Sequence, residues 1–86
     1  LYTTTTMNIT FYSSRLYEKE KLLNANRPYN HQFSFEPALL SIETIMAAKD
    51  ASVISVFTND DLSAPILEQL HKQNIRHIAI RAAGYN

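Results

Sequence analysis

The chain has 86 residues, which is enough for one small domain and too short for a second. Its 8 basic and 8 acidic residues balance, so it lacks the cationic surplus that nonspecific binding to nucleic acid requires, and it contains no run of about 18 apolar residues that could span a membrane. The absence of cysteine excludes disulfides, thiolate metal ligands and thiol catalysis, and it is compatible with a cytoplasmic protein, which we expect.

The first half of the chain predicts a strand, a helix and a second strand. Polar and apolar residues alternate over residues 8–12, a pattern typical of a strand. Ser13 and Ser14 are predicted to cap a helix that ends before Pro28, because the residue preceding a proline disfavours the helical region. Residues 32–36 alternate again and predict the second strand.

The second half predicts two more helices and two more strands. Ser41 precedes spaced apolar residues and is predicted to begin a short helix. Residues 53–57 form a nearly continuous apolar strand, as in a sheet covered on both faces. Residues 63–65 open the next helix with proline in its first turn, Asn74 is predicted to take the left-handed conformation after it, and residues 76–81 contain the fourth strand.

The predicted order of elements is therefore β-α-β-α-β-α-β. Strands that alternate with helices indicate an α/β fold with parallel strands joined by right-handed crossovers. In such sheets, ligands bind beyond the carboxyl ends of the strands. We expect residues 12–15, 57–61 and 81–86 to meet at that edge.

Acidic and histidine residues are the first candidates for chemistry. Asp60 and Asp61 follow the third strand, where a pair of carboxylates suits either a hard cation or the start of a helix, and the structural interpretation is favoured. The histidines lie on different elements without metal-ligand spacing, and they are His31, His71 and His77. We expect no metal site.

The only glycine of the chain, Gly84, follows the last predicted strand at the edge where ligands are expected. One glycine is too few for the loops that bind nucleotide phosphates, so we expect no cofactor site in this chain. Small residues at positions 82–84 allow a ligand to approach the backbone, whose consecutive N–H groups can bind a carboxylate. A plain turn accounts for the same residues from spacing alone.

Four stretches of the chain match one known family in order and spacing, and they are residues 7–14, 41–49, 53–62 and 81–86. They resemble the catalytic, substrate-binding domain of the D-isomer-specific 2-hydroxyacid dehydrogenases, most closely the D-lactate dehydrogenase branch. The resemblance implies a flavodoxin-like, three-layer αβα parallel sheet that is incomplete. Residues 7–86 would be the N-terminal portion of that domain, and residues 1–6 would be a flexible leader.

The resemblance also implies roles for individual residues. In the family, the backbone of an Ala-Gly step binds the substrate carboxylate, which carries this role to Ala83 and Gly84. Phe57 stands where an aromatic residue helps to close the substrate pocket. The family's nucleotide domain and its catalytic arginine, glutamate and histidine lie beyond residue 86, so we expect no catalytic, cofactor-binding or metal-binding residue here.

The resemblance implies a parent enzyme that uses NAD and acts on a 2-oxoacid and its 2-hydroxyacid, D-lactate and pyruvate. The parent would be a homo-oligomer, and its NAD-binding domain would be the partner of this segment, which we expect to be inactive alone. Two alternatives stay open. One is a standalone flavodoxin-like binding or signalling module in which Asp60 and Asp61 form an acidic site. The other is a truncated remnant without function.

Overall fold

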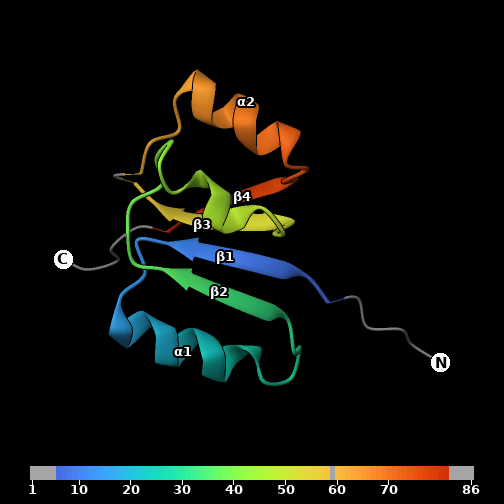
Figure 1. Cartoon of the computed structure of the whole chain (residues 1–86). Helices are drawn as coiled ribbons and strands as arrows, with labels where there is room; N and C mark the ends of the chain where they lie inside the picture. Colours follow the sequence, from blue (N-terminus) through green and yellow to red (C-terminus); the bar gives the residue numbers. More distant parts are fainter. Residues whose placement is uncertain (1–5, 59, 82–86) are drawn as a thin grey trace.

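The chain is described by a computed structural model, which covers residues 6–58 and 60–81 (Figure 1). Its elements in chain order are β1 (Asn8–Tyr12), α1 (Leu16–Asn26), β2 (Gln32–Glu36), the 3-10 helix η1 (Ile45–Ala48), β3 (Val53–Phe57), α2 (Ala64–Lys72) and β4 (His77–Arg81). The strands form one sheet of four in the order β2-β1-β3-β4, and every neighbouring pair is parallel. The predicted α/β class and parallel topology are confirmed.

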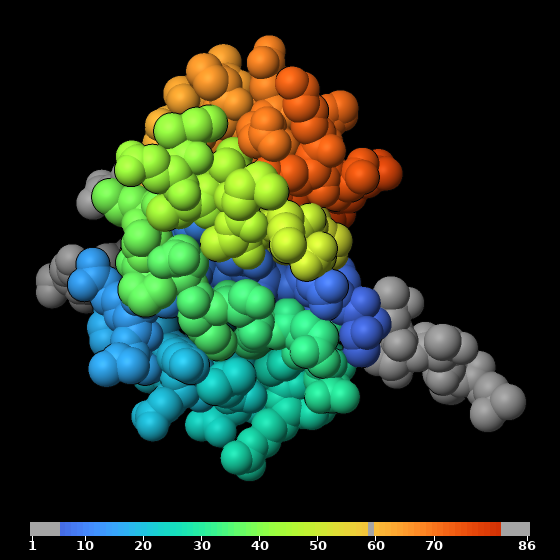
Figure 2. Space-filling view, viewed as in Figure 1, coloured from blue at the N-terminus to red at the C-terminus, as the bar shows by residue number. Residues whose placement is uncertain are grey.

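Helices lie on both faces of this sheet. Figure 1 shows α1 beside β2, α2 beside β4, and η1 in front of the central strands. In Figure 2 the yellow-green segment that contains η1 crosses the front of the sheet next to α2. The core lies between this layer and the strands, and its buried residues are Tyr12, Leu40, Ile45, Ala48, Ala51, Ile54, Val56, Ile66 and Leu70.

The opposite face is more sparsely covered. Phe11 of β1 is buried there between two aromatic rings of β2, with ring centroids 4.8 Å from Phe33 and 5.2 Å from Phe35. The Nζ atom of Lys19 on α1 lies 5.3 Å from the centroid of Phe35. α1 buries none of its own residues fully, so long polar side chains supply much of the cover on this face. Within the described residues, no helix is long and apolar enough to cross a membrane.

The predicted helix after Ser41 forms only as η1, a 3-10 helix. The buried hydroxyl of Tyr12 donates to the carbonyl oxygens of Thr44 at 2.8 Å and Ile45 at 3.3 Å. The Thr44 carbonyl also accepts the N–H of Ala47 at 3.0 Å, the tighter i→i+3 pattern. Ile45 and Ala48, three positions apart, are both buried, which suits a helix with three residues per turn.

The ends of the α-helices follow the prediction in part. Ser63 is the N-cap position of α2, Pro65 lies in its first turn, and Asn74 has a φ of 63°, so these predictions are confirmed. The predicted caps of α1 are wrong. The N-cap position is Arg15 and it makes no side-chain capping bond, while Ser13 has a φ of 54°. The Ser13 hydroxyl instead donates to the Asp60 carboxylate.

Candidate functional site

The carboxyl ends of β1, β3 and β4 lie side by side at one edge of the sheet. Tyr12 pairs with Glu36 at the end of β1, and Phe57 pairs with Arg81 at the ends of β3 and β4. The Ser13 hydroxyl donates to the Asp60 carboxylate at 2.8 Å, so the predicted meeting of residues 12–15 with residues 57–61 is confirmed. Of the third segment only Arg81 is described, and Ala83 and Gly84 lie outside the described residues.

The Asp60 carboxylate accepts hydrogen bonds from three separate segments of the chain at this edge. Its side chain is buried, with 8% of its surface exposed. Its Oδ1 accepts the hydroxyl of Ser13 at 2.8 Å and the backbone N–H of Leu40 at 2.7 Å, and its Oδ2 accepts the backbone N–H of Phe57 at 2.6 Å. Both oxygens are thus committed to protein donors, which favours the structural interpretation of this residue over an acid/base or metal role.

Asp61 differs from Asp60 in both its exposure and its hydrogen-bond partner. It is exposed, and its Oδ1 accepts the backbone N–H of Ser63 at 2.9 Å in a tight turn before α2. The hydrogen bonds from Ser63 hold the pKa of the Asp61 carboxyl below its usual value. Asp60 and Asp61 therefore do not converge on a shared ligand, which is what an acidic site would require.

Arg81 is the second residue on which this edge depends, and no role was predicted for it from the sequence. Its Nη1 donates to the Ser55 hydroxyl at 2.9 Å, and its Nη2 donates to the Tyr12 carbonyl at 2.7 Å. Its Nε and Nη2 donate to the two carboxylate oxygens of Glu18 at 3.0 and 3.3 Å. The guanidinium thus connects β4 to β3, to β1 and to the first turn of α1.

The ring of Phe57 is flanked by cations. The guanidinium carbon of Arg81 lies 4.6 Å from the ring centroid, and that of Arg15 lies 5.7 Å from it. Both distances are in the range of cation–π contacts. Phe57 is half-buried, so part of its surface remains accessible at the carboxyl edge.

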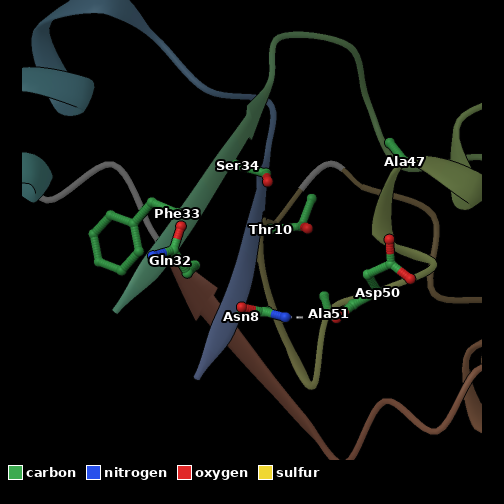
Figure 3. Close-up of a pocket in the computed structure, with 8 residues that line it drawn as sticks. All are labelled: Asn8, Thr10, Gln32, Phe33, Ser34, Ala47, Asp50 and Ala51. Carbon is green, nitrogen blue, oxygen red and sulfur yellow. Dashed lines mark hydrogen bonds between the residues drawn. The ribbon is translucent and has the colours of Figure 1, made fainter. Parts of the chain in front are cut away.

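The histidines and the hollow drawn in Figure 3 do not contribute to this edge. His31 accepts the backbone N–H of Met7 through Nδ1 at 3.1 Å, and the residues that the structure describes contain no cluster of three or more possible metal ligands. A hollow of about 270 Å³ lies between η1 and the first strands (Figure 3). Its lining includes Asn8, Gln32 and Asp50, which belong to the opposite end of the strands.

Tyr12, the last residue of β1, is fully buried, with 0% of its surface exposed. Burial raises its pKa from 10.0 to about 12, and the nearby carboxylate of Glu36 adds to the shift. Its proton is therefore retained in the folded chain at pH values where the unfolded chain loses it. The Tyr12 hydroxyl acts as a hydrogen-bond donor to the start of η1.

This shift predicts a pH dependence of stability that Tyr12→Phe removes. Because the folded pKa is the higher one, the contribution of the hydroxyl is complete below pH 10.0 and is lost as the pH rises toward about 12. We expect Tyr12→Phe to lower the free energy of unfolding by about 1 kcal/mol at neutral pH. The difference in the free energy of unfolding between the unsubstituted chain and Tyr12→Phe, measured by urea unfolding, should become smaller above pH 10.0. A difference that stays constant through this range would contradict the assignment.

A parallel α/β sheet whose carboxyl edge gathers polar groups from several strands defines a ligand-binding class of domain. The chain matches the family of the D-isomer specific 2-hydroxyacid dehydrogenases, catalytic domain, over residues 9–86, and it belongs to that family. It is 35% identical over 80 residues to the D-lactate dehydrogenase of Escherichia coli and 38% identical over 80 residues to 2-hydroxyacid dehydrogenase homolog 1 of Schizosaccharomyces pombe.

The solved structure of a Salmonella D-lactate dehydrogenase superimposes with a TM-score of 0.84 at 35% identity, over 93% of this chain and 24% of that one. Both curated relatives above are likewise matched over 93% of this chain and 24% of their own length. The chain therefore spans about a quarter of the length of the relatives that it matches. The predicted family and its α/β fold are confirmed.

Proposed function

We propose that residues 7–86 are the N-terminal portion of the catalytic domain of an NAD-dependent D-2-hydroxyacid dehydrogenase that interconverts D-lactate and pyruvate. The observation that carries the proposal is the junction of the β1, β3 and β4 ends at one edge, in a chain that belongs to this family. The 2-oxoacid would bind at that edge. The cytoplasmic location and the homo-oligomeric parent remain predictions.

Three residues would serve the substrate. Ala83 and Gly84 would donate backbone N–H groups to its carboxylate, and Phe57, at the end of the adjacent strand, would supply apolar cover. The register that places Arg81 opposite Phe57 supports this arrangement, because residue 82 continues directly from Arg81.

This chain does not fit a nicotinamide dinucleotide. Its only glycine is Gly84, whereas dinucleotide-binding loops need several glycines before a helix. Hydride transfer, and the acid/base and carboxylate-binding side chains that accompany it, would come from the parent protein's NAD-binding domain and from residues beyond 86. No residue of this chain is assigned a catalytic role.

The proposal predicts that the 86-residue chain alone has no dehydrogenase activity. Purified chain, mixed with NADH and pyruvate, is expected to leave the NADH absorbance unchanged, because no group in it holds the nicotinamide or transfers a proton to the substrate. Turnover that scales with the amount of chain would contradict this prediction.

The reading frame beyond the codon of Asn86 supplies the complementary test. We expect it to encode a glycine-rich nucleotide loop, and the full-length protein should oxidise D-lactate with NAD. A full-length protein that carries such a loop and turns over no 2-hydroxyacid would overturn the proposed function.

A further inference from the structure

We propose that Arg81 is a positioning residue for the 2-oxoacid site, an inference that rests on the proposed function. Arg81 is the last residue of β4, directly before the segment that would bind the substrate carboxylate. Its three side-chain nitrogens all donate hydrogen bonds, and their partners belong to β1, β3 and α1. The guanidinium therefore holds the end of β4 in place against three other elements.

The arrangement of these bonds excludes Arg81 as the group that itself binds the substrate carboxylate. Its charge is matched by the Glu18 carboxylate, whose two oxygens accept from Nε and Nη2. The Glu18 and Arg81 side chains are only 17% and 15% exposed, so the pair is largely withdrawn from solvent. An incoming carboxylate would have to displace Glu18 from this ion pair and leave the Glu18 carboxylate without its partner.

A planar guanidinium is required for this position. The hydrogen bonds run in different directions within the plane of the group, to the Ser55 hydroxyl, to the Tyr12 carbonyl and to Glu18. A lysine ammonium presents its donors from one point and cannot reach all of these acceptors together. The guanidinium carbon also lies 4.6 Å from the centroid of the Phe57 ring, so the same group supports the proposed apolar cover.

The test uses the full-length protein with four substitutions: Arg81→Lys, Arg81→Met, Glu18→Gln and, as the matched control, Arg76→Lys. Arg76 is exposed and lies just before β4, at the far end of the same strand. For each protein, KM for pyruvate, KM for NADH and the melting temperature are measured. Both Arg81 variants are expected to raise KM for pyruvate about tenfold or more with KM for NADH unchanged, because small misplacements of binding groups have effects of this size.

Glu18→Gln separates positioning from direct binding. If Arg81 positions the site, the neutral glutamine side chain holds the Arg81 guanidinium less firmly than the carboxylate does, and KM for pyruvate rises about threefold. A fall in KM for pyruvate would show that Glu18 competes with the substrate for Arg81, and it would overturn the inference. So would Arg81 variants that melt earlier but keep the KM for pyruvate of the unsubstituted protein, because that pattern indicates a role in stability alone.

The same experiment distinguishes this inference from the proposed function. If the unsubstituted full-length protein turns over no 2-oxoacid, the proposed function fails and the inference fails with it. If the unsubstituted protein and Arg76→Lys turn over pyruvate alike while Arg81→Lys matches them in KM, only the role of Arg81 is refuted.

Discussion

Asp60→Ala is expected to lower the free energy of unfolding by about 3 kcal/mol or more, because it leaves three donors without their acceptor. The backbone N–H groups of Leu40 and Phe57 and the hydroxyl of Ser13 all end on this carboxylate, at 2.6–2.8 Å. Leu40 is 1% exposed, so water cannot replace its lost partner without opening the core. Since small domains have about 5–15 kcal/mol in total, the loss is a large fraction of the stability.

Two further substitutions make the expectation specific. Asp60→Asn keeps the size of the side chain but replaces one acceptor oxygen with a donor, and we expect it to destabilise by about 1–3 kcal/mol. Asp61→Asn is the matched control, since it changes a neighbouring exposed carboxylate and keeps an oxygen for the Ser63 N–H group. Urea unfolding followed by circular dichroism measures all three. Equal stabilities for Asp60→Ala and Asp61→Asn would contradict the role of Asp60.

The strands of this fold could be predicted from local patterns because each pattern has one dominant cause. In β2, Phe33 and Phe35 are more buried than the polar residues before and between them, whereas β1 is buried on both faces over residues 10–12. β3 is apolar because both of its faces are covered. Asn74 could be placed in the left-handed region because asparagine is one of the few residue types that adopt it readily. The helix after Ser41 could not be predicted correctly, since its form depends on a hydroxyl 32 residues earlier.

The candidate site was predictable only as a location. Parallel strands bring their carboxyl ends to one edge, so the meeting of the Tyr12 and Phe57 ends followed from the order of elements. The roles of Ser13 and Arg81 did not follow. The Ser13 hydroxyl meets a carboxylate 47 residues away, and Arg81 meets Tyr12 and Glu18 across 69 and 63 residues. Spacing along the chain carries no information about such pairs, and a serine before a helix equally suits a cap.

The proposed role of Phe57 as apolar cover for the substrate predicts a large effect of substituting this residue in the full-length protein. Phe57→Ala is expected to raise KM for the 2-oxoacid about tenfold, because losing roughly half of a phenylalanine's burial energy corresponds to about 1–1.5 kcal/mol. Phe57→Leu keeps an apolar side chain at the same place and should stay within about threefold of the unsubstituted protein. The backbone N–H that Asp60 accepts is present in both variants, so this test is independent of the first.

The two cations that flank the Phe57 ring offer a competing explanation for an effect of Phe57→Ala on KM. If the aromatic face matters through Arg81 at 4.6 Å and Arg15 at 5.7 Å, leucine would be as poor as alanine, because only an aromatic ring makes a cation–π contact. We expect leucine to be sufficient, since Arg81 is held by hydrogen bonds that do not involve the ring. Tyr29→Ala, which removes an exposed ring stacked on His31, is the control and should leave KM unchanged. A leucine variant that matches the alanine variant would refute apolar cover as the role of Phe57.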